Sequence, residues 1–227
     1  MDAEVHTIIA ELMRDMHQLS SAQDNLNALI GSISSGAVTY VPGAQFAGVL
    51  LVKKKKEFES LGVTDPVVAQ LDEIQMQVGE GPCLEAAWEQ PTVWMNNFYD
   101  EQRFRLFAEK AISETAVRSS LSFQLFTHEG AMGALNLFSE KVDAFTWESE
   151  EVGFVYATHA ALALFRARQE MHFNSALASR DIIGQAKGMI MERFTVDAVQ
   201  AFELLRKLSQ DSNVPLVDIA KKLVANR

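Results

Sequence analysis

The sequence is poor in cysteine: Cys83 is the only one in 227 residues. A single thiol excludes an intrachain disulfide framework and a zinc site built from two thiolates of one chain, and it fits a reducing compartment. Proline and glycine are also sparse, with 5 and 12 residues, whereas 48% of the residues are hydrophobic. This composition predicts a globular protein with a substantial core and excludes a disordered or low-complexity chain.

Long apolar runs and excess positive charge are missing as well. No run approaches the roughly 18 to 20 apolar residues of a membrane-spanning helix, and the start, MDAEVHTIIAELMRD, lacks the basic and apolar regions of a signal peptide. The 20 lysines and arginines are outnumbered by 30 aspartates and glutamates, a net charge of −10. Bulk attraction to nucleic acid or anionic membranes is therefore disfavoured, and we expect a cytoplasmic protein without a membrane partner.

The first 140 residues show a mixed α+β pattern. Apolar residues recur at three-and-four spacing through the first 35 residues, which predicts helix, and Asp65 followed by Pro66 marks the start of another helix. Further expected elements are a buried strand at 46–52, its partner at 57–64 across the solvated tip Lys53–Lys56, a short helix at 84–90 ended by Pro91, and adjacent strands at 118–126 and 132–138 with His128, Glu129 and Gly130 in the turn.

The remaining chain is helical. One helix is expected from Thr146 to about His172, followed by three pieces near 176–194, 197–210 and 216–225, whose apolar stripes can bury one another. Residues 1–173 carry 12 basic and 24 acidic side chains, whereas residues 174–227 carry 8 and 6. The C-terminal block, with a net charge of +2, is therefore the one place where a polyanion could dock.

No residues form a recognisable catalytic or metal-binding motif. The five histidines lie far apart without HxxxH spacing, and the sequence has neither a phosphate-binding loop nor a GxGxxG motif. The acidic pairs Asp72-Glu73 and Glu150-Glu151 are expected on solvated helix faces. We therefore predict that the protein is not an enzyme and uses neither a metal nor a cofactor.

The segment Gly79–Glu85, GEGPCLE, is unusual. Its glycines permit positive φ, and Pro82 starts a helix whose free N–H groups form an anion-friendly lip. Cys83 lies in the first turn of that helix, where a thiolate is favoured. The pattern predicts a ligand-pocket wall or a redox-responsive thiol; the alternative is a tight turn with a small buried residue.

A second unusual segment, Arg180–Met191, reads RDIIGQAKGMIM and is expected to be helical. Gly184 and Gly188 each cost about 1 kcal/mol relative to alanine inside a helix. They share one face of the helix, with Arg180 and Lys187 nearby. Either an external backbone or ligand approaches closely beside two cations, or a neighbouring helix packs into the glycine groove, and the residues leave both explanations open.

At these residues the chain resembles a known family. Ala176–Val224 resembles an ANTAR domain, the three-helix RNA-binding module of bacterial transcription antiterminators, through RxxIxxAKGxxM at Arg180–Met191, AFxLLR at Ala201–Arg206 and the Ile219-Ala220 pair. The resemblance implies binding to paired stem-loops in nascent RNA, which holds off a terminator hairpin. It implies RNA contact by Arg180, Ala186, Lys187, Gly188 and Arg206, while Ala201, Phe202, Leu205 and Ala220 hold the helices together.

The upstream chain resembles a GAF domain, through VGEGPCLEAAW at 78–88, VRSSLSFQL at 117–125 and GALNLFS at 133–139. The expected fold is α+β, with an antiparallel sheet flanked by helices in residues 1–172 and a three-helix ANTAR bundle in residues 173–227. GAF domains bind varied small ligands over the sheet, so the resemblance names no ligand. The expected pocket residues, which fall on or beside strands and motif turns, are Cys83, Trp94, Arg118, Ser120 and Ser122.

Dimerisation has its own basis in the sequence. A seam with three-and-four spacing and polar interruptions crosses the domain junction, at Val152, Val155, His159, Leu162, Arg166, Gln169, Phe173 and Ala176. It predicts a parallel homodimer through residues 147–176 with help from residues 2–33; the alternative is that the stripe packs inside one chain. A neighbouring stripe is expected to cover the sheet or the N-terminal helix, at Ala161, Leu164, Arg168 and Met171.

The predicted function is that of a ligand- or redox-responsive antiterminator controlled by its GAF domain or by dimerisation, because no receiver-like pattern of acidic residues is present. Two alternatives stay open. The C-terminal helices could form a DNA-binding helix-turn-helix in which Pro215 opens the recognition helix, or the chain could be a sensor or scaffold whose bundle mediates only protein contacts.

Overall fold

The computed structural model describes residues 10, 14, 26–52, 58–127 and 130–225. The helices expected in residues 2–25, the tip Lys53–Lys56 and the turn at His128-Glu129 lie outside this part of the chain. The chain divides into two compact units, Met1–Ala167 and Arg168–Arg227. We call them the sensor unit and the C-terminal unit, and each is described separately.

The described elements of the sensor unit include both helices and strands, whereas those of the C-terminal unit are all helical. The strands are β1 (Phe46–Val52), β2 (Phe58–Leu61), β3 (Thr92–Met95), β4 (Ser119–Thr127) and β5 (Gly130–Ser139). The helices are α2 (Leu26–Tyr40), α3 (Pro66–Val78), α4 (Pro82–Trp88), α5 (Arg105–Glu114), α6 (Trp147–Phe194), α7 (Ala198–Ser212) and α8 (Leu216–Ala225). No helix in the described part of the chain is long and apolar enough to cross a membrane.

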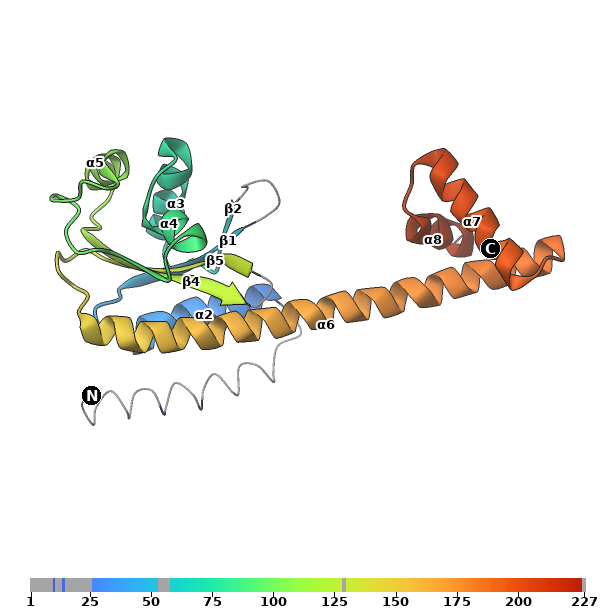
Figure 1. Cartoon of the computed structure of the whole chain (residues 1–227), viewed down its shortest axis with the longest axis horizontal. Coiled ribbons are helices and arrows are strands. Elements are labelled where there is room, and N and C mark those ends of the chain that lie inside the picture. The colour runs from blue at the N-terminus through green and yellow to red at the C-terminus, as the bar shows by residue number, and fades with distance from the viewer. Residues whose placement is uncertain (1–9, 11–13, 15–25, 53–57, 128–129, 226–227) are drawn as a thin grey trace. The chain divides into compact units, whose positions relative to one another are not determined.

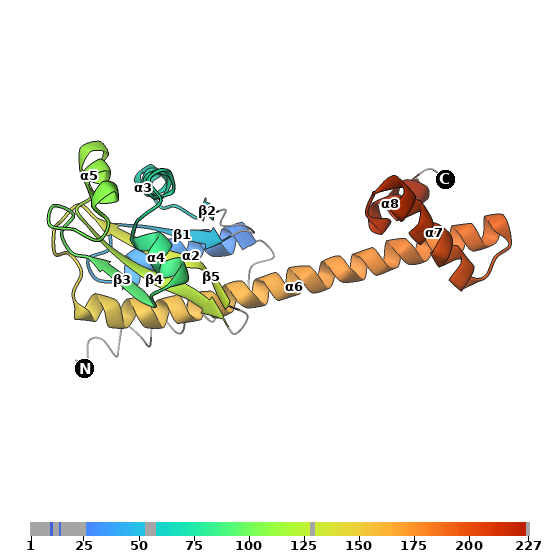
Figure 2. The ribbon, with the colours of Figure 1, turned by 45° about the horizontal axis from the view of Figure 1, so that its top comes forward.

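The strands form one antiparallel sheet in the order β2-β1-β5-β4-β3 (Figure 2). The apolar run FAGVLLV becomes β1, between β2 and β5, where a strand covered on both faces reads as a continuous apolar run. Strand β3 was not predicted, because its four residues, TVWM, show too little periodicity. The predicted α+β fold, with an antiparallel sheet and flanking helices, is confirmed.

Helix α2 and the N-terminal part of α6 cover one face of the sheet (Figure 1). A Cβ at Gly153 would lie 2.3 Å from the Phe123 ring, so glycine lets α6 approach β4 closely. The Tyr156 hydroxyl donates a hydrogen bond to the Ile33 carbonyl at 2.8 Å and ties α6 to α2. The expected covering stripe contributes two buried residues to this face, Ala161 and Leu164.

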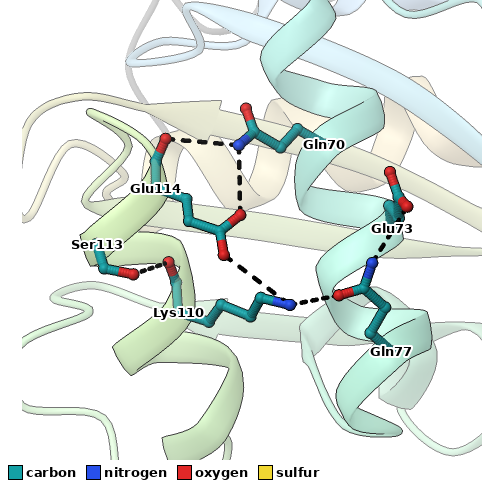
Figure 3. A network of polar contacts seen from close by, with 6 residues as sticks. All are labelled: Gln70, Glu73, Gln77, Lys110, Ser113 and Glu114. Carbon is teal, nitrogen blue, oxygen red and sulfur yellow. Dashed lines mark hydrogen bonds and ion pairs between the residues drawn. The ribbon is translucent and has the colours of Figure 1, made fainter.

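Helices α3, α4 and α5 cover the opposite face (Figure 1). Asp65 caps α3 by accepting from the Val67 N–H at 2.9 Å, and Pro66 is the first helical residue, as predicted. A polar network joins α3 to α5 (Figure 3): the Lys110 ammonium donates to the Gln77 side chain, and Gln70 donates to the backbone and side chain of Glu114 at 3.5 Å. The network lies at the surface and fixes the two helices side by side.

The C-terminal unit is a small three-helix bundle made by the end of α6 with α7 and α8. Its buried core comprises Ala186, Ile190, Ala201, Leu205, Ile219 and Ala220. A capping box of Asp197 and Gln200 starts α7. The packing role expected for Phe202 is wrong, since 40% of this residue is exposed.

Helix α6 continues through the segment where a break was expected between about His172 and Ala176. The intervening residues, Phe173, Asn174 and Ser175, include neither proline nor glycine, so nothing in them stops the helix.

Candidate functional sites

A cluster of buried polar residues lies between the sheet and helices α3 and α4, with Cys83 at its centre. We call this cluster the buried polar centre. Gln75 holds this residue at two points, because its Oε1 accepts from the Cys83 N–H at 2.8 Å and its Nε2 donates to Sγ at 2.9 Å. The Ser122 hydroxyl lies 3.8 Å from the same sulfur. A Cβ at Gly81, where φ is 149°, would lie 2.3 Å from Gln75 Oε1, so these two hydrogen bonds require a glycine at this position.

The hydrogen bonds between Gln75 and Cys83 contradict the anion-friendly lip of free N–H groups that is expected at the start of α4. The Cys83 N–H at the start of α4 already donates to Gln75, and Cys83 is fully buried. Burial, together with the nearby charge of Asp72, holds the pKa of Cys83 well above its usual value. The expectation of a favoured thiolate is therefore wrong, and Cys83 is a protonated, packed thiol.

Asp72 is also fully buried, so the expected solvated Asp72-Glu73 face is wrong for Asp72. The Ser60 hydroxyl donates to its Oδ2 at 2.5 Å, whereas Oδ1 has no hydrogen-bond partner among the described residues. Burial raises the pKa of Asp72 to about 7, an effect only partly offset by its hydrogen bond from Ser60 and by the nearby Cys83 thiol. The sensor core thus contains a carboxyl that titrates near neutral pH.

More unpartnered polar atoms lie on the face of the sheet that α3 and α4 cover. Asn136 is paired in register with Ser122, and its side-chain oxygen and nitrogen are both buried without a partner in the described chain. The buried Ser120 hydroxyl is in the same state. Buried polar atoms are normally hydrogen-bonded. These orphaned atoms therefore mark a place where a bound molecule or water can be held.

The structure brings together three of the five expected pocket residues, Cys83, Ser120 and Ser122, all fully buried. Trp94 packs against the opposite core, on the α2 and α6 side, where its indole N–H donates to Glu150 at 3.2 Å. Arg118 immediately precedes β4, and its guanidinium donates to the Tyr99 hydroxyl at 2.8 Å and to the Thr115 and Val117 carbonyls. Neither lies with the other three.

Sequence reasoning missed the partners of Cys83. Asp72 and Gln75 follow Val68 and Leu71 on the buried stripe of α3, and all four are buried. The three-and-four spacing is present in the sequence, but two of its members are polar, and spacing alone does not mark polar residues as buried. Asn136 lies in the central strand β5, where its burial follows from its position.

In the C-terminal unit, the two unusual glycines lie on an open helix surface. Gly184 and Gly188 are exposed, and a Cβ built at either meets no atom within 4 Å. Packing of a neighbouring helix into a glycine groove therefore has no support within the described chain. Arg180 is exposed and Lys187 half-buried beside these glycines, and neither forms an ion pair among the described residues.

The other two expected RNA-contact residues are placed differently. Ala186 is fully buried in the bundle core, which does not fit direct contact with RNA. Arg206 is exposed on α7, where it pairs with Glu203 at 2.6 Å.

An antiparallel sheet covered by helices on both faces, with a buried polar centre, defines an α+β domain, and a small helical bundle follows it in the sequence. A family model described as GAF domain matches residues 23–164, and one described as ANTAR domain matches residues 172–224. The chain therefore belongs to the GAF domain family and carries a C-terminal ANTAR domain. This combination makes it a regulatory protein that joins a sensor domain to an effector domain.

Solved structures share the sensor fold at low sequence identity. The GAF domain from a phosphoenolpyruvate-protein phosphotransferase of Coxiella burnetii has a TM-score of 0.59 and 15% identity, covering 73% of this chain and 98% of its own. Free methionine-R-sulfoxide reductase from Neisseria meningitidis has a TM-score of 0.57 and 15% identity, covering 75% and 95%. These likenesses show the fold alone. No curated protein matches the chain.

Proposed function

We propose that this protein is a cytoplasmic transcription antitermination regulator whose ANTAR domain binds paired stem-loops in nascent RNA under the control of its GAF domain. The observation that carries the proposal is the open face of α6 at Gly184 and Gly188, flanked by Arg180 and Lys187. In this proposal the chain is not an enzyme and has no catalytic, metal or cofactor site.

The chemistry of that face suits RNA loops. Sequence-specific RNA recognition targets unstacked loop bases, which need close backbone approach together with cations for the phosphates. The two glycines cost about 1 kcal/mol each relative to alanine in a helix, and no described residue packs against them in return. Their surface is therefore available to an external partner, and Lys187 and Arg180 give it the charge that phosphates require.

We further propose a parallel homodimer through residues 147–176 and the N-terminal helices, which would supply one ANTAR domain for each stem-loop. Five large apolar residues of α6 are exposed within this range, and two of them, Leu162 and Phe173, belong to the expected seam. The exposed fractions are 58% for Trp147, 50% for Phe154, 49% for Leu162, 42% for Met171 and 64% for Phe173. Val152, also in the expected seam, is buried inside the sensor unit, so only part of the seam is open to a second chain. We retain domain limits of 1–172 and 173–227.

The sensor part of the proposal rests on the orphaned polar atoms of the buried centre. A small polar molecule held by Asp72, Ser120 and Asn136, beside Cys83 and Ser122, would satisfy atoms that have no partner in the described chain. Burial and protonation of Cys83 favour ligand sensing over a redox-responsive thiol.

The decisive experiment measures RNA affinity against salt for the full chain and two variants. Lys187→Ala should weaken binding to a double stem-loop RNA and reduce the salt slope by about one, since one phosphate contact is lost. The matched control is Lys221→Ala, which removes the same charge from α8 and should leave RNA binding unchanged. Loss of binding in Lys221→Ala alone, with duplex DNA as the better competitor, would favour the helix-turn-helix alternative. Absence of any RNA binding by the folded protein would favour the scaffold.

A further inference from the structure

A groove of about 820 Å³ opens on the sensor unit outside the buried polar centre. It is lined by residues of β2, α3, α4 and the segments beside them, among them Phe58, Met76, Leu84, Glu85, Trp88 and Glu89. Its size falls in the range of about 300 to 1,000 Å³ that is typical of small-molecule sites. Asp72, Cys83 and Ser122 do not line it, so it is separate from the centre described above.

The groove has an aromatic corner. The Phe58 and Trp88 rings meet edge to face, with centroids 6.4 Å apart and an interplanar angle of 79°. Trp88 remains 48% exposed and Met76 43% exposed, so both offer apolar surface to a molecule in the groove. Two nearly perpendicular rings form adjoining walls, an arrangement that suits a compact group held against ring faces.

The charge of the groove has one sign. Among the described residues, its lining includes three carboxylates and neither lysine nor arginine, although the Arg103 guanidinium lies 5.0 Å from the centroid of the lining Phe104 ring. Glu80 already accepts from the Leu106 and Phe107 N–H groups at the start of α5, at 2.6 and 3.2 Å. Glu85 and Glu89 lie one turn apart and flank Trp88 in the sequence. The side chains of both lack a hydrogen-bond partner in the described chain, although Arg103 lies close enough to Glu85 to interact with its charge.

We propose that this groove binds a small organic cation of the alkylammonium class. The ring faces of Trp88 and Phe58 would attract the cationic head through cation–π contacts, and Glu85 and Glu89 would complement its charge. Met76 and Leu84 would cover the alkyl body. The same carboxylates repel phosphates and other anions, so the site discriminates against nucleotides. This goes beyond the proposed function, because it gives the sensor unit a second input apart from its buried centre.

Calorimetric titration of the full chain with choline and with 3,3-dimethyl-1-butanol, its uncharged carbon isostere, tests the proposal. Choline should bind saturably, and the alcohol at least about tenfold more weakly, because only the charge differs. Trp88→Ala should weaken choline binding about tenfold, whereas Trp88→Phe, which keeps a ring, should retain most of it. The double change Glu85→Gln and Glu89→Gln should weaken it as well.

The matched control is Glu140→Gln, which removes an exposed carboxylate outside the groove and should leave choline binding unchanged. Equal binding of choline and the alcohol would overturn the proposal, because the groove would then be merely apolar. So would unchanged choline binding by folded Trp88→Ala, or binding of a lysine-rich peptide by a chain that does not bind choline. If Trp88→Ala does not fold, choline binding by Trp88→Phe and by the double glutamate variant decides. Binding retained in Trp88→Phe and weakened in the double variant supports the proposal, and equal binding by both overturns it.

Discussion

The two units of this protein bury polar groups very differently. In the sensor unit, the core encloses a carboxyl, an amide and a thiol in Asp72, Gln75 and Cys83, and some of the buried polar atoms have no partner in the described chain. In the C-terminal unit, the buried core consists of six apolar residues, and the polar and glycine positions face outward. A polar interior suits the binding of a small molecule within the fold. An apolar core with an exposed, glycine-bearing helix face suits contact with a large external partner.

The largest expected effect concerns Asp72, the carboxyl inside the sensor core. Its folded pKa of about 7 lies above the ordinary value of 3.8, so between these values the folded state holds a proton that the unfolded state releases. The stability contributed by this group should fall as pH rises from about 4 to 7, by on the order of 4 kcal/mol, and then level off. Asp72→Asn should abolish this dependence in denaturant unfolding measured across that pH range.

Glu73→Gln is the matched control, since the neighbouring Glu73 is exposed and should leave the pH profile unchanged. A profile with the same slope in Asp72→Asn as in the natural sequence would show that Asp72 is not the buried titrating group.

A smaller effect is expected from opening a cavity in the bundle core. Leu205→Ala, at a position only 1% exposed, should cost about 3 kcal/mol through lost burial and the cavity left behind. Since the C-terminal unit has few other buried residues, this loss should unfold it selectively. The equivalent change Leu137→Ala in the larger sensor core should cost a similar amount and leave that unit folded. Circular dichroism on heating, with limited proteolysis to identify the unfolded unit, distinguishes the two variants. Equal protease resistance of both variants would contradict the expected selective unfolding of the C-terminal unit.

The smallest expected effect is a stabilisation. Gly184→Ala should raise the stability of the C-terminal unit by about 1 kcal/mol, because alanine favours the helix and its Cβ meets no atom. Gly153→Ala in the sensor unit should instead destabilise, because its Cβ would lie 2.3 Å from the Phe123 ring. Thermal unfolding of the two variants side by side should give shifts of opposite sign. A destabilised Gly184→Ala would mean that this glycine has a structural role.

Where the sequence had strong local signals, it predicted the fold well. Asp65-Pro66 marked the start of α3, and the apolar run at 46–52 marked β1, because both carry local chemistry. The side to which a residue points was harder to predict. Trp94 and Ser122 are both predicted pocket residues, yet Val93 and Met95 of β3 face α3 to α5, so Trp94 between them faces the opposite side of the sheet. Ala186 lies next to Lys187 in the motif but points into the bundle core, since neighbouring residues of a helix face different directions.

The central proposal is that the open glycine face of α6 contacts RNA. The most direct test measures the affinity of the full chain for a double stem-loop RNA with Gly188→Leu, together with the thermal stability of the variant. A leucine there places a bulky side chain on the open surface, where a Cβ meets no atom within 4 Å. We predict that RNA affinity falls at least about tenfold, through the blocked close approach, while stability is unchanged or increased. Undiminished RNA affinity in the folded variant would contradict the account.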